Sequence, residues 1–253
     1  KVVLGIAKSS HRLAMIFDAY IAYRRYLELR PRGTGPREAR KAVTSLEAEY
    51  VNPRSALGDF GAGELAYVNN KFDEAIDCFD AGLEKAPLSA ITYYNRANAW
   101  YAKATISGAG VHARSAISDY DRVLLLKPGH GTALAGRALC WLLLRKYDPA
   151  LEDARKAMSL LPQAALSFNT AGLASFSLER YRDAVEYYDR AIKLDSKEAT
   201  YRINRARAKW SLRDFDGALA DLKTASELEI TPEQGTEIRG IQDKIRIQRE
   251  QGG

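Results

Sequence analysis

The stretch SFNTAGLASFSLERYRDAVEYYDRAIKLDS, residues 167–196, contains two short apolar patterns separated by the polar turn Leu178-Glu179-Arg180. Side chains of the first pattern recur at helical spacing and share one face: Phe168, Ala171, Gly172 and Ser175. The second pattern has the same spacing: Tyr181, Ala184, Tyr188 and Ala191. The periodicity predicts two antiparallel helices that cross where the residues are small. Small residues allow the backbones to approach, and the tyrosines fill the space around them.

The same pattern recurs along the chain, mostly at a period of 34 residues. One small position is occupied in turn by Ala75, Ala116, Ala150, Ala184 and Ala218. A second is occupied by Gly63, Ala97, Ala138, Gly172 and Ala206. The two series agree apart from seven extra residues between Ala97 and Ala116. A single hairpin cannot bury its apolar face, so the repeats are expected to stack into one continuous core.

These repeats resemble the tetratricopeptide repeat (TPR). The residues that carry the resemblance are Gly63-Phe72-Ala75-Phe79-Pro87, Ala97-Trp100-Ala116-Tyr120-Pro128, Ala138-Trp141-Tyr147-Ala150-Ala157-Pro162, Gly172-Tyr181-Ala184-Tyr188-Ala191 and Ala206-Phe215-Ala218-Ala225. The resemblance covers about residues 54–230 and implies an all-α fold, a right-handed alpha-alpha superhelix (TPR solenoid) of stacked antiparallel helix pairs. Ser196 and Ile230 replace the closing proline, and Ala154 and Leu222 replace a preferred aromatic residue.

The repeat phases predict the organisation of the chain. Five units are expected at 54–87, 88–128, 129–162, 163–196 and 197–230, with an insertion near 103–112 in the second. The insertion is either a partner-specific loop or lid, or a tolerated turn between lengthened helices. Residues 231–250 are expected to form a capping helix that begins with Thr231 and Pro232. Residues 1–53 are expected to be helical, with a degenerate repeat followed by a spacer helix.

Charge and hydropathy argue against two classes of protein, general nucleic-acid coat proteins and membrane-spanning proteins. The 38 Lys and Arg outnumber the 32 Asp and Glu, and the excess is concentrated in residues 1–41. This asymmetry argues against a general nucleic-acid coat protein. No apolar run approaches the roughly 18 residues of a membrane span, so we expect a soluble chain. The chain has no initiator Met and no signal-peptide pattern. The sequence does not decide the compartment, although the cytoplasm is favoured over the periplasm or secretion. It also does not decide the oligomeric state or whether the parent protein has further domains.

The residues give little support for catalysis. The three histidines, His11, His112 and His130, lie in separate segments, and no Walker-type loop is present. Cys78 and Cys140 fit small buried hydrophobic positions. The acidic stretches at Asp73-Glu74 and Glu152-Asp153 fit helix starts and solvated faces. We therefore expect no enzyme activity, no cofactor and no metal.

In the TPR family, the first helix of each unit lines a concave groove that holds a peptide. The resemblance places these side chains there: Tyr67, Tyr94, Asn95, Asn98, Tyr101, Asn169, Leu173, Phe176, Asn204, Arg207 and Trp210. Asparagine can donate to and accept from a peptide backbone, and aromatic rings offer large apolar area with few rotors. The row predicts an apolar to neutral peptide partner. Each residue could instead pack between helices or satisfy a turn.

One TPR subtype clamps the terminal carboxylate of chaperone tails with lysine and asparagine residues. Here Tyr94 stands where the lysine belongs, and Gly136 stands where the next asparagine belongs. Starting one unit earlier, Phe60 and Glu64 replace the first pair. Chaperone tails are therefore disfavoured as partners.

Two alternative functions remain. A basic N-terminal patch could bind an anionic partner such as nucleic acid, a membrane surface or an acidic protein, although solvated helix faces explain the same charges. It comprises Arg24, Arg25, Arg30, Arg32, Arg37, Arg40 and Lys41. Binding through phosphate contacts would weaken steeply with salt. Self-association is the other alternative, because an array with an atypical end can stack on a copy of itself.

Overall fold

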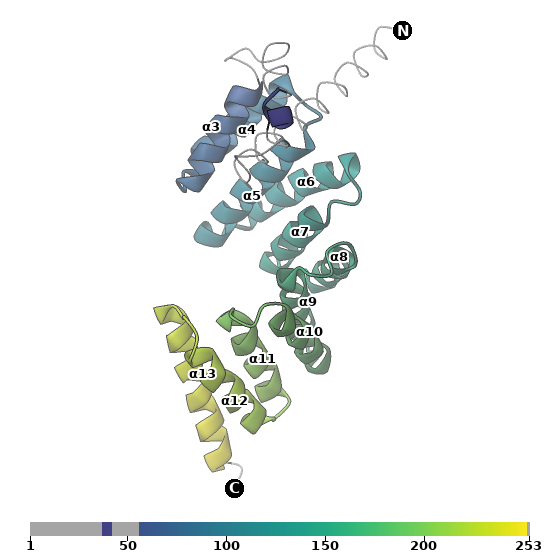
Figure 1. Ribbon diagram of the computed structural model, residues 1–253. Helices are drawn as coiled ribbons and strands as arrows, with labels where there is room; N and C mark the ends of the chain where they lie inside the picture. Colours follow the sequence, from purple (N-terminus) through teal and green to yellow (C-terminus); the bar gives the residue numbers. More distant parts are fainter. Residues whose placement is uncertain (1–36, 42–55, 252–253) are drawn as a thin grey trace. The chain divides into compact units, whose positions relative to one another are not determined.

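The computed structural model describes residues 37–41 and 56–251, and every regular element in these ranges is an α-helix (Figure 1). The chain divides into two compact units, Lys1–His130 and Gly131–Gly253. The expected degenerate repeat and most of the spacer helix lie outside the described residues.

The described part of the first unit, from residue 56 onward, contains two helix pairs. Helices α3 (Ala56–Val68) and α4 (Phe72–Lys85) form one pair, and α5 (Ala90–Ser107) and α6 (Gly110–Leu126) form the other. Helix α4 also packs on α5, which joins the two pairs. The surplus residues lengthen the second pair, since α5 has 18 residues where α3 has 13.

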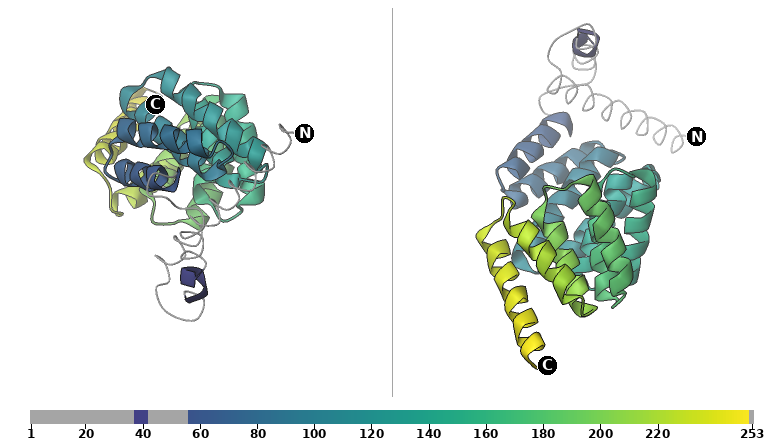
Figure 2. Two further views of the ribbon diagram at one scale, coloured as in Figure 1. Left: turned by 90° about the horizontal axis from the view of Figure 1, so that it is seen from above. Right: turned by 60° about the horizontal axis from the view of Figure 1, so that its bottom comes forward.

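The second unit contains three further helix pairs and a terminal helix. The pairs are α7 (Gly131–Leu143) with α8 (Tyr147–Leu160), α9 (Ala165–Ser177) with α10 (Tyr181–Leu194), and α11 (Ala199–Ser211) with α12 (Phe215–Ser226). Each second helix packs on the first helix of the next pair. Helix α13 (Pro232–Gln251) follows beside α12 (Figure 2). The predicted stack of antiparallel helix pairs is confirmed within each unit.

Glycine is required where two of the helix pairs cross. A Cβ atom at Gly63 would lie 2.6 Å from the Phe79 ring, and one at Gly172 would lie 2.5 Å from the Tyr188 ring. Both rings are almost completely buried. The absent side chain of each glycine therefore provides the space that the aromatic ring of the second helix occupies.

The connections within the pairs share one backbone conformation. Asn70, Arg145, Glu179 and Arg213 each have φ between 56° and 62°, in the left-handed region that favours glycine. In the lengthened pair, Gly108 has φ 65° and caps the C-terminus of α5. Three second helices, α4, α6 and α8, end two residues before a proline, as the repeat pattern predicts.

The terminal helix α13 has a capping box at its start. The backbone N–H of Gln234 donates to Thr231 Oγ1 at 3.3 Å, and the Gln234 side chain accepts from the Thr231 N–H at 2.8 Å. One face of α13 then buries Ile238, Ile241 and Ile245 in a cluster with residues of α11 and α12. This apolar face agrees with the predicted capping helix.

Buried arginine–aspartate pairs join the two helices of three pairs, and the sequence interpretation missed them. Arg137 on α7 donates through Nε and Nη2 to both carboxylate oxygens of Asp153 on α8, each at 2.7 Å. Arg96 pairs in the same way with Asp119, and Arg205 with Asp221. The three aspartates are buried. The expectation of a solvated-face charge is therefore wrong for Asp153, because a bidentate partner compensates for its desolvation.

The two cysteines differ in environment. Cys140 on α7 is fully buried, as expected for a small hydrophobic residue, and burial raises its thiol pKa to about 12. Cys78 on α4 is only half-buried, so the expectation of a buried position is wrong there. Cys78 directly precedes Phe79, whose ring packs against Gly63 of α3 where the two helices cross.

Candidate functional site

In the first unit, three predicted groove residues are tyrosines on α3 and α5. Tyr67 is 36% exposed, and its ring lies edge-on to Phe72 at 5.6 Å. Partial burial, with Tyr94 nearby, raises the pKa of the Tyr67 hydroxyl. Tyr94 is half-buried and contacts the rings of Tyr120 and His130. Tyr101 is half-buried, one helical turn after Asn98.

The two predicted asparagines of this unit form hydrogen bonds within the protein. Asn95 Nδ2 donates to Glu64 Oε1 at 3.2 Å, which links α5 to α3. Asn98 Oδ1 accepts from the hydroxyl of Tyr120 on α6 at 2.6 Å. These side chains therefore connect helices in addition to any contact with a partner.

In the second unit, the structure brings two predicted asparagines from neighbouring pairs together. Asn204 Nδ2 on α11 donates to Asn169 Oδ1 on α9 at 3.0 Å, and both residues are about 95% buried. Leu173 and Phe176 on α9 are half-buried and pack against Ala184, Tyr188 and Ala208. The exposed apolar side chain of this helix is Leu166, at 48%.

The last two predicted groove residues contact helix α13. Arg207 lies with its guanidinium 5.2 Å from the Phe176 ring centre and 3.6 Å from a Glu237 carboxylate oxygen. The Trp210 indole N–H donates to Gln248 Oε1 at 2.7 Å, and Lys244 lies over its ring. Both side chains therefore help to attach the terminal helix.

Most of the predicted basic patch lies outside the described residues. Arg24, Arg25, Arg30 and Arg32 fall there, whereas residues 37–41 form a short helical segment. In that segment, Arg37, Arg40 and Lys41 are exposed and Ala39 is buried.

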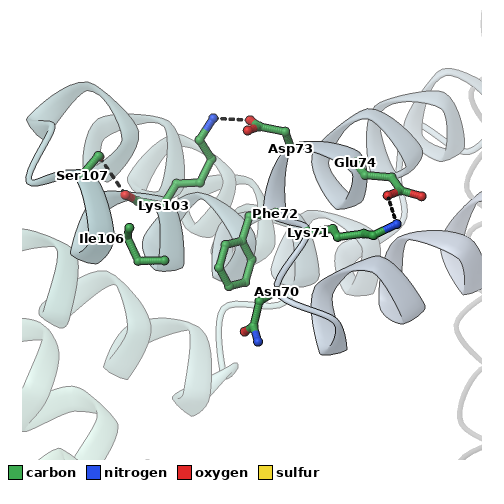
Figure 3. A pocket seen from close by; sticks show the side chains of 8 residues that line it. All are labelled: Asn70, Lys71, Phe72, Asp73, Glu74, Lys103, Ile106 and Ser107. Atoms are coloured by element: carbon green, nitrogen blue, oxygen red, sulfur yellow. Dashed lines mark hydrogen bonds and ion pairs between the residues drawn. The ribbon is translucent and has the colours of Figure 1, made fainter.

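A pocket that the sequence did not predict lies beside the insertion (Figure 3). It has a volume of 470 Å³ and lies between the start of α4 and the end of α5. Its lining residues are Asn70, Lys71, Phe72, Asp73, Glu74, Lys103, Ile106 and Ser107. The seven surplus residues were the one feature of the sequence that pointed to this region, but the sequence did not show that they would pack beside the start of α4.

The described ranges contain neither a candidate metal site nor a candidate membrane span. Within residues 37–41 and 56–251, no three His, Cys, Asp or Glu side chains gather as metal ligands. Among the same residues, no helix combines the length and the apolar composition that a bilayer crossing requires.

Comparison with solved structures identifies similar folds. MamA from Desulfovibrio magneticus RS-1, beginning at its residue 41, aligns with a TM-score of 0.61 and 20% identity, over 68% of this chain and 94% of that one. YrrB, described as a TPR protein with an unusual peptide-binding site, aligns with a TM-score of 0.58 and 16% identity, over 78% of this chain and 97% of that one. At these identities the similarity shows the fold alone.

Sequence comparison identifies the family. A segment of 112 residues is 28% identical to the Small glutamine-rich tetratricopeptide repeat-containing protein 2 of Mycosarcoma maydis, and covers 44% of this chain. The chain spans only 32% of that relative's length. A family model described as Tetratricopeptide repeat matches residues 32–90, 60–109 and 169–233, which together exceed half of the 253 residues. The chain belongs to the tetratricopeptide repeat family.

Proposed function

We propose that this chain is a non-catalytic interaction scaffold whose first helices bind an extended peptide segment of a partner protein. The observation that carries the proposal is the set of partly exposed apolar side chains at the family's groove positions. These are Tyr67, Tyr94 and Tyr101 in the first unit, and Leu173 and Phe176 in the second, where Leu166 is exposed on the same helix α9. The peptide-binding site ascribed to YrrB supports this use of the fold.

The hydrogen bonds within each unit support a peptide site that is mainly apolar. Asn95, Asn98, Asn169 and Asn204 have partners inside the protein, and Arg207 pairs with Glu237. Their main role is therefore to hold the helices in register. The tyrosine and leucine surfaces supply the binding energy, since aromatic and aliphatic anchors lose little rotamer freedom for the area that they bury. The preferred peptide is apolar to neutral.

The proposal is tested with randomised 12-residue peptides displayed on phage and selected on the full chain. A selected peptide is then synthesised, and its Kd is measured by fluorescence anisotropy. Leu166→Asp on α9 should weaken binding at the second unit about tenfold or more, the effect of losing one anchor. Leu160→Asp on α8 is the matched control, because Leu160 is exposed to a similar degree, 45% against 48%. Tyr101→Ala is the corresponding variant for peptides that bind the first unit.

Salt dependence distinguishes the proposal from the basic-patch alternative. Apolar binding should change little between low and high salt, whereas phosphate or carboxylate contacts with arginine weaken steeply. Loss of binding only in an Arg24→Glu/Arg25→Glu/Arg30→Glu variant, with a steep salt dependence, would transfer the function to the N-terminal segment. Equal binding by Leu166→Asp, Tyr101→Ala and the wild-type chain would reject the first helices as the site.

A further inference from the structure

The pocket beside the insertion is a consequence of the seven surplus residues. Helices α3, α7, α9 and α11 each have 13 residues, and a helix of that length starting at Ala90 would end at Ala102. Helix α5 continues to Ser107. All three α5 residues that line the pocket, Lys103, Ile106 and Ser107, belong to this extension. A first helix of 13 residues would therefore lack this wall of the pocket.

The apolar part of the pocket consists of an aromatic ring and an exposed aliphatic side chain. Phe72, the first residue of α4, lies at the centre of Figure 3, with Ile106 on one side and Lys71 on the other. Tyr67 supports the Phe72 ring from α3, with the ring centres 5.6 Å apart. Ile106 is 75% exposed. An apolar side chain inserted between Phe72 and Ile106 would remove surface of both from water, which is favourable.

The charged groups of the pocket differ in how firmly they are held. Lys103 is paired with Asp73, and its ammonium lies 5.4 Å from the centre of the Trp100 ring. His112 stacks on that same ring at 5.4 Å. The Lys103 side chain is only 23% exposed, whereas the Asp73 side chain is 80% exposed. Lys71 and Glu74 form a second pair at 3.0 Å, with both side chains more than half exposed.

This difference in exposure determines which partner charge is complementary. An exposed ion pair contributes little to stability, so an incoming carboxylate can replace Asp73 at small cost. Lys103 remains in place because Trp100 holds it. The fixed charge at the pocket wall is therefore positive, and it lies next to an apolar surface.

We propose that this pocket is a second docking site, which binds a segment of a partner protein containing an apolar side chain next to an Asp or Glu carboxylate. The apolar side chain packs between Phe72 and Ile106, and the carboxylate replaces Asp73 at the Lys103 ammonium. The volume of 470 Å³ is ample for one such side chain and the backbone beside it. The site adjoins the first-helix face of α5, to which Lys103, Ile106 and Ser107 belong, but its apolar walls, Phe72 and Ile106, are not among the predicted groove residues.

The test uses the full chain and a phage library of randomised 12-residue peptides, depleted first on the Ile106→Asp variant. The selected pool should be enriched in peptides with an aliphatic or aromatic residue within two positions of Asp or Glu. A synthetic peptide from the pool, with blocked termini, should bind Ile106→Asp and Ile106→Ser at least about tenfold more weakly by fluorescence anisotropy. Leu125→Asp on α6, matched to Ile106 at 71% exposure, should bind it as the wild type does.

Two charge variants test the proposed replacement of Asp73. Lys103→Gln should weaken the peptide and reduce its salt dependence, whereas Asp73→Asn should tighten it severalfold because a competing carboxylate is removed. Leu166→Asp, in the other unit, should leave this peptide unaffected, which separates the result from binding at the α9 face. A pool without the apolar–acidic pairing, the absence of any Ile106-dependent peptide, or weaker binding to Asp73→Asn would each overturn the proposal.

Discussion

Gly172 shows how a single hydrogen atom in place of a side chain can set the distance between two helices. A Cβ atom at this position would lie 2.5 Å from Cε1 of Tyr188, whose ring is fully buried and cannot move aside. Gly172→Ala should therefore lower the free energy of unfolding of the second unit by about 1–3 kcal/mol. Urea unfolding followed by circular dichroism measures this change.

The matched control is Gly240→Ala on the exposed face of α13. No heavy atom lies within 4 Å of a Cβ at Gly240, so alanine gains helix propensity without a clash. This variant should stabilise the same unit by about 0.5–1 kcal/mol. Opposite signs for the two glycines are expected. A stabilised Gly172→Ala variant would mean that the crossing can relax around Tyr188.

The helices of a pair are also joined by buried charge. Asp153 is 3% exposed, and the guanidinium of Arg137 donates to both of its carboxylate oxygens. Arg137→Met leaves this carboxylate buried without its bidentate partner, and should cost about 3–5 kcal/mol of unfolding free energy. Chemical denaturation of the variant at pH 7 checks the value.

The α9–α10 pair suggests which second substitution would restore the stability that Arg137→Met removes. There, Ala171 and Tyr187 occupy the repeat positions of Arg137 and Asp153, and the Tyr187 hydroxyl accepts from Arg155 Nε at 2.9 Å. The double variant Arg137→Ala/Asp153→Tyr should therefore be more stable than Arg137→Met, since no carboxylate remains buried. A double variant less stable than the single one would show that the ion pair is required for the packing of α7 on α8.

The turns between paired helices provide a second test of element geometry. Glu179 has φ 59°, where a side chain is strained and glycine is not. Glu179→Gly should raise the free energy of unfolding by about 0.5–1 kcal/mol. The neighbouring Arg180 has φ −85°, so Arg180→Gly should give no gain and serves as the control. A thermal melt of the two variants distinguishes these outcomes, and equal effects would contradict the role assigned to the left-handed turn.

The helix pairs could be predicted because each small residue recurs at the repeat spacing and must face an aromatic or aliphatic partner. Gly172 opposite Tyr188 is the clearest case. The arginine–aspartate pairs had the same signal, since Arg96, Arg137 and Arg205 recur in phase, as do Asp119, Asp153 and Asp221. They were overlooked because charged residues on amphipathic helices are usually exposed.

Other features of the candidate sites depend on neighbours that periodicity does not identify. The phase of Asn169 and Asn204 predicted a row facing a peptide, but their mutual hydrogen bond depends on the spacing between α9 and α11. Likewise, the insertion near 103–112 was recognised, whereas its contact with Asp73 and Phe72 requires the packing of α5 on α4. Sequence therefore located the candidate elements, whereas the pairing of their side chains within the protein follows from tertiary contacts.

For the molecule as a whole, the two cysteines report on different units. Cys78 belongs to the first unit, and Cys140 lies fully buried in the second. Burial raises the pKa of Cys140 to about 12, so at pH 8 almost none of its thiolate, the reactive form, is present. Burial, and after it the charges of Glu74, Asp59 and Asp77, also raise the pKa of Cys78. Because Cys78 is only half-buried, it should still react in the folded chain, although slowly. Cys140 should react only after its unit opens.

This difference allows the coupling between the units to be measured in a Cys78→Ser background. Gly63→Ala forces a Cβ to within 2.6 Å of the Phe79 ring and should destabilise the first unit by about 1–3 kcal/mol. In a repeat protein, stability is a sum of local and nearest-neighbour terms, so the protection of Cys140 from Ellman's reagent at pH 8 should change much less than in Gly172→Ala. The ratio of the two labelling rates is the measurement. Equal loss of protection in both variants would mean that the whole chain unfolds as one cooperative body, because a strained crossing in either unit would then expose Cys140 to the same extent.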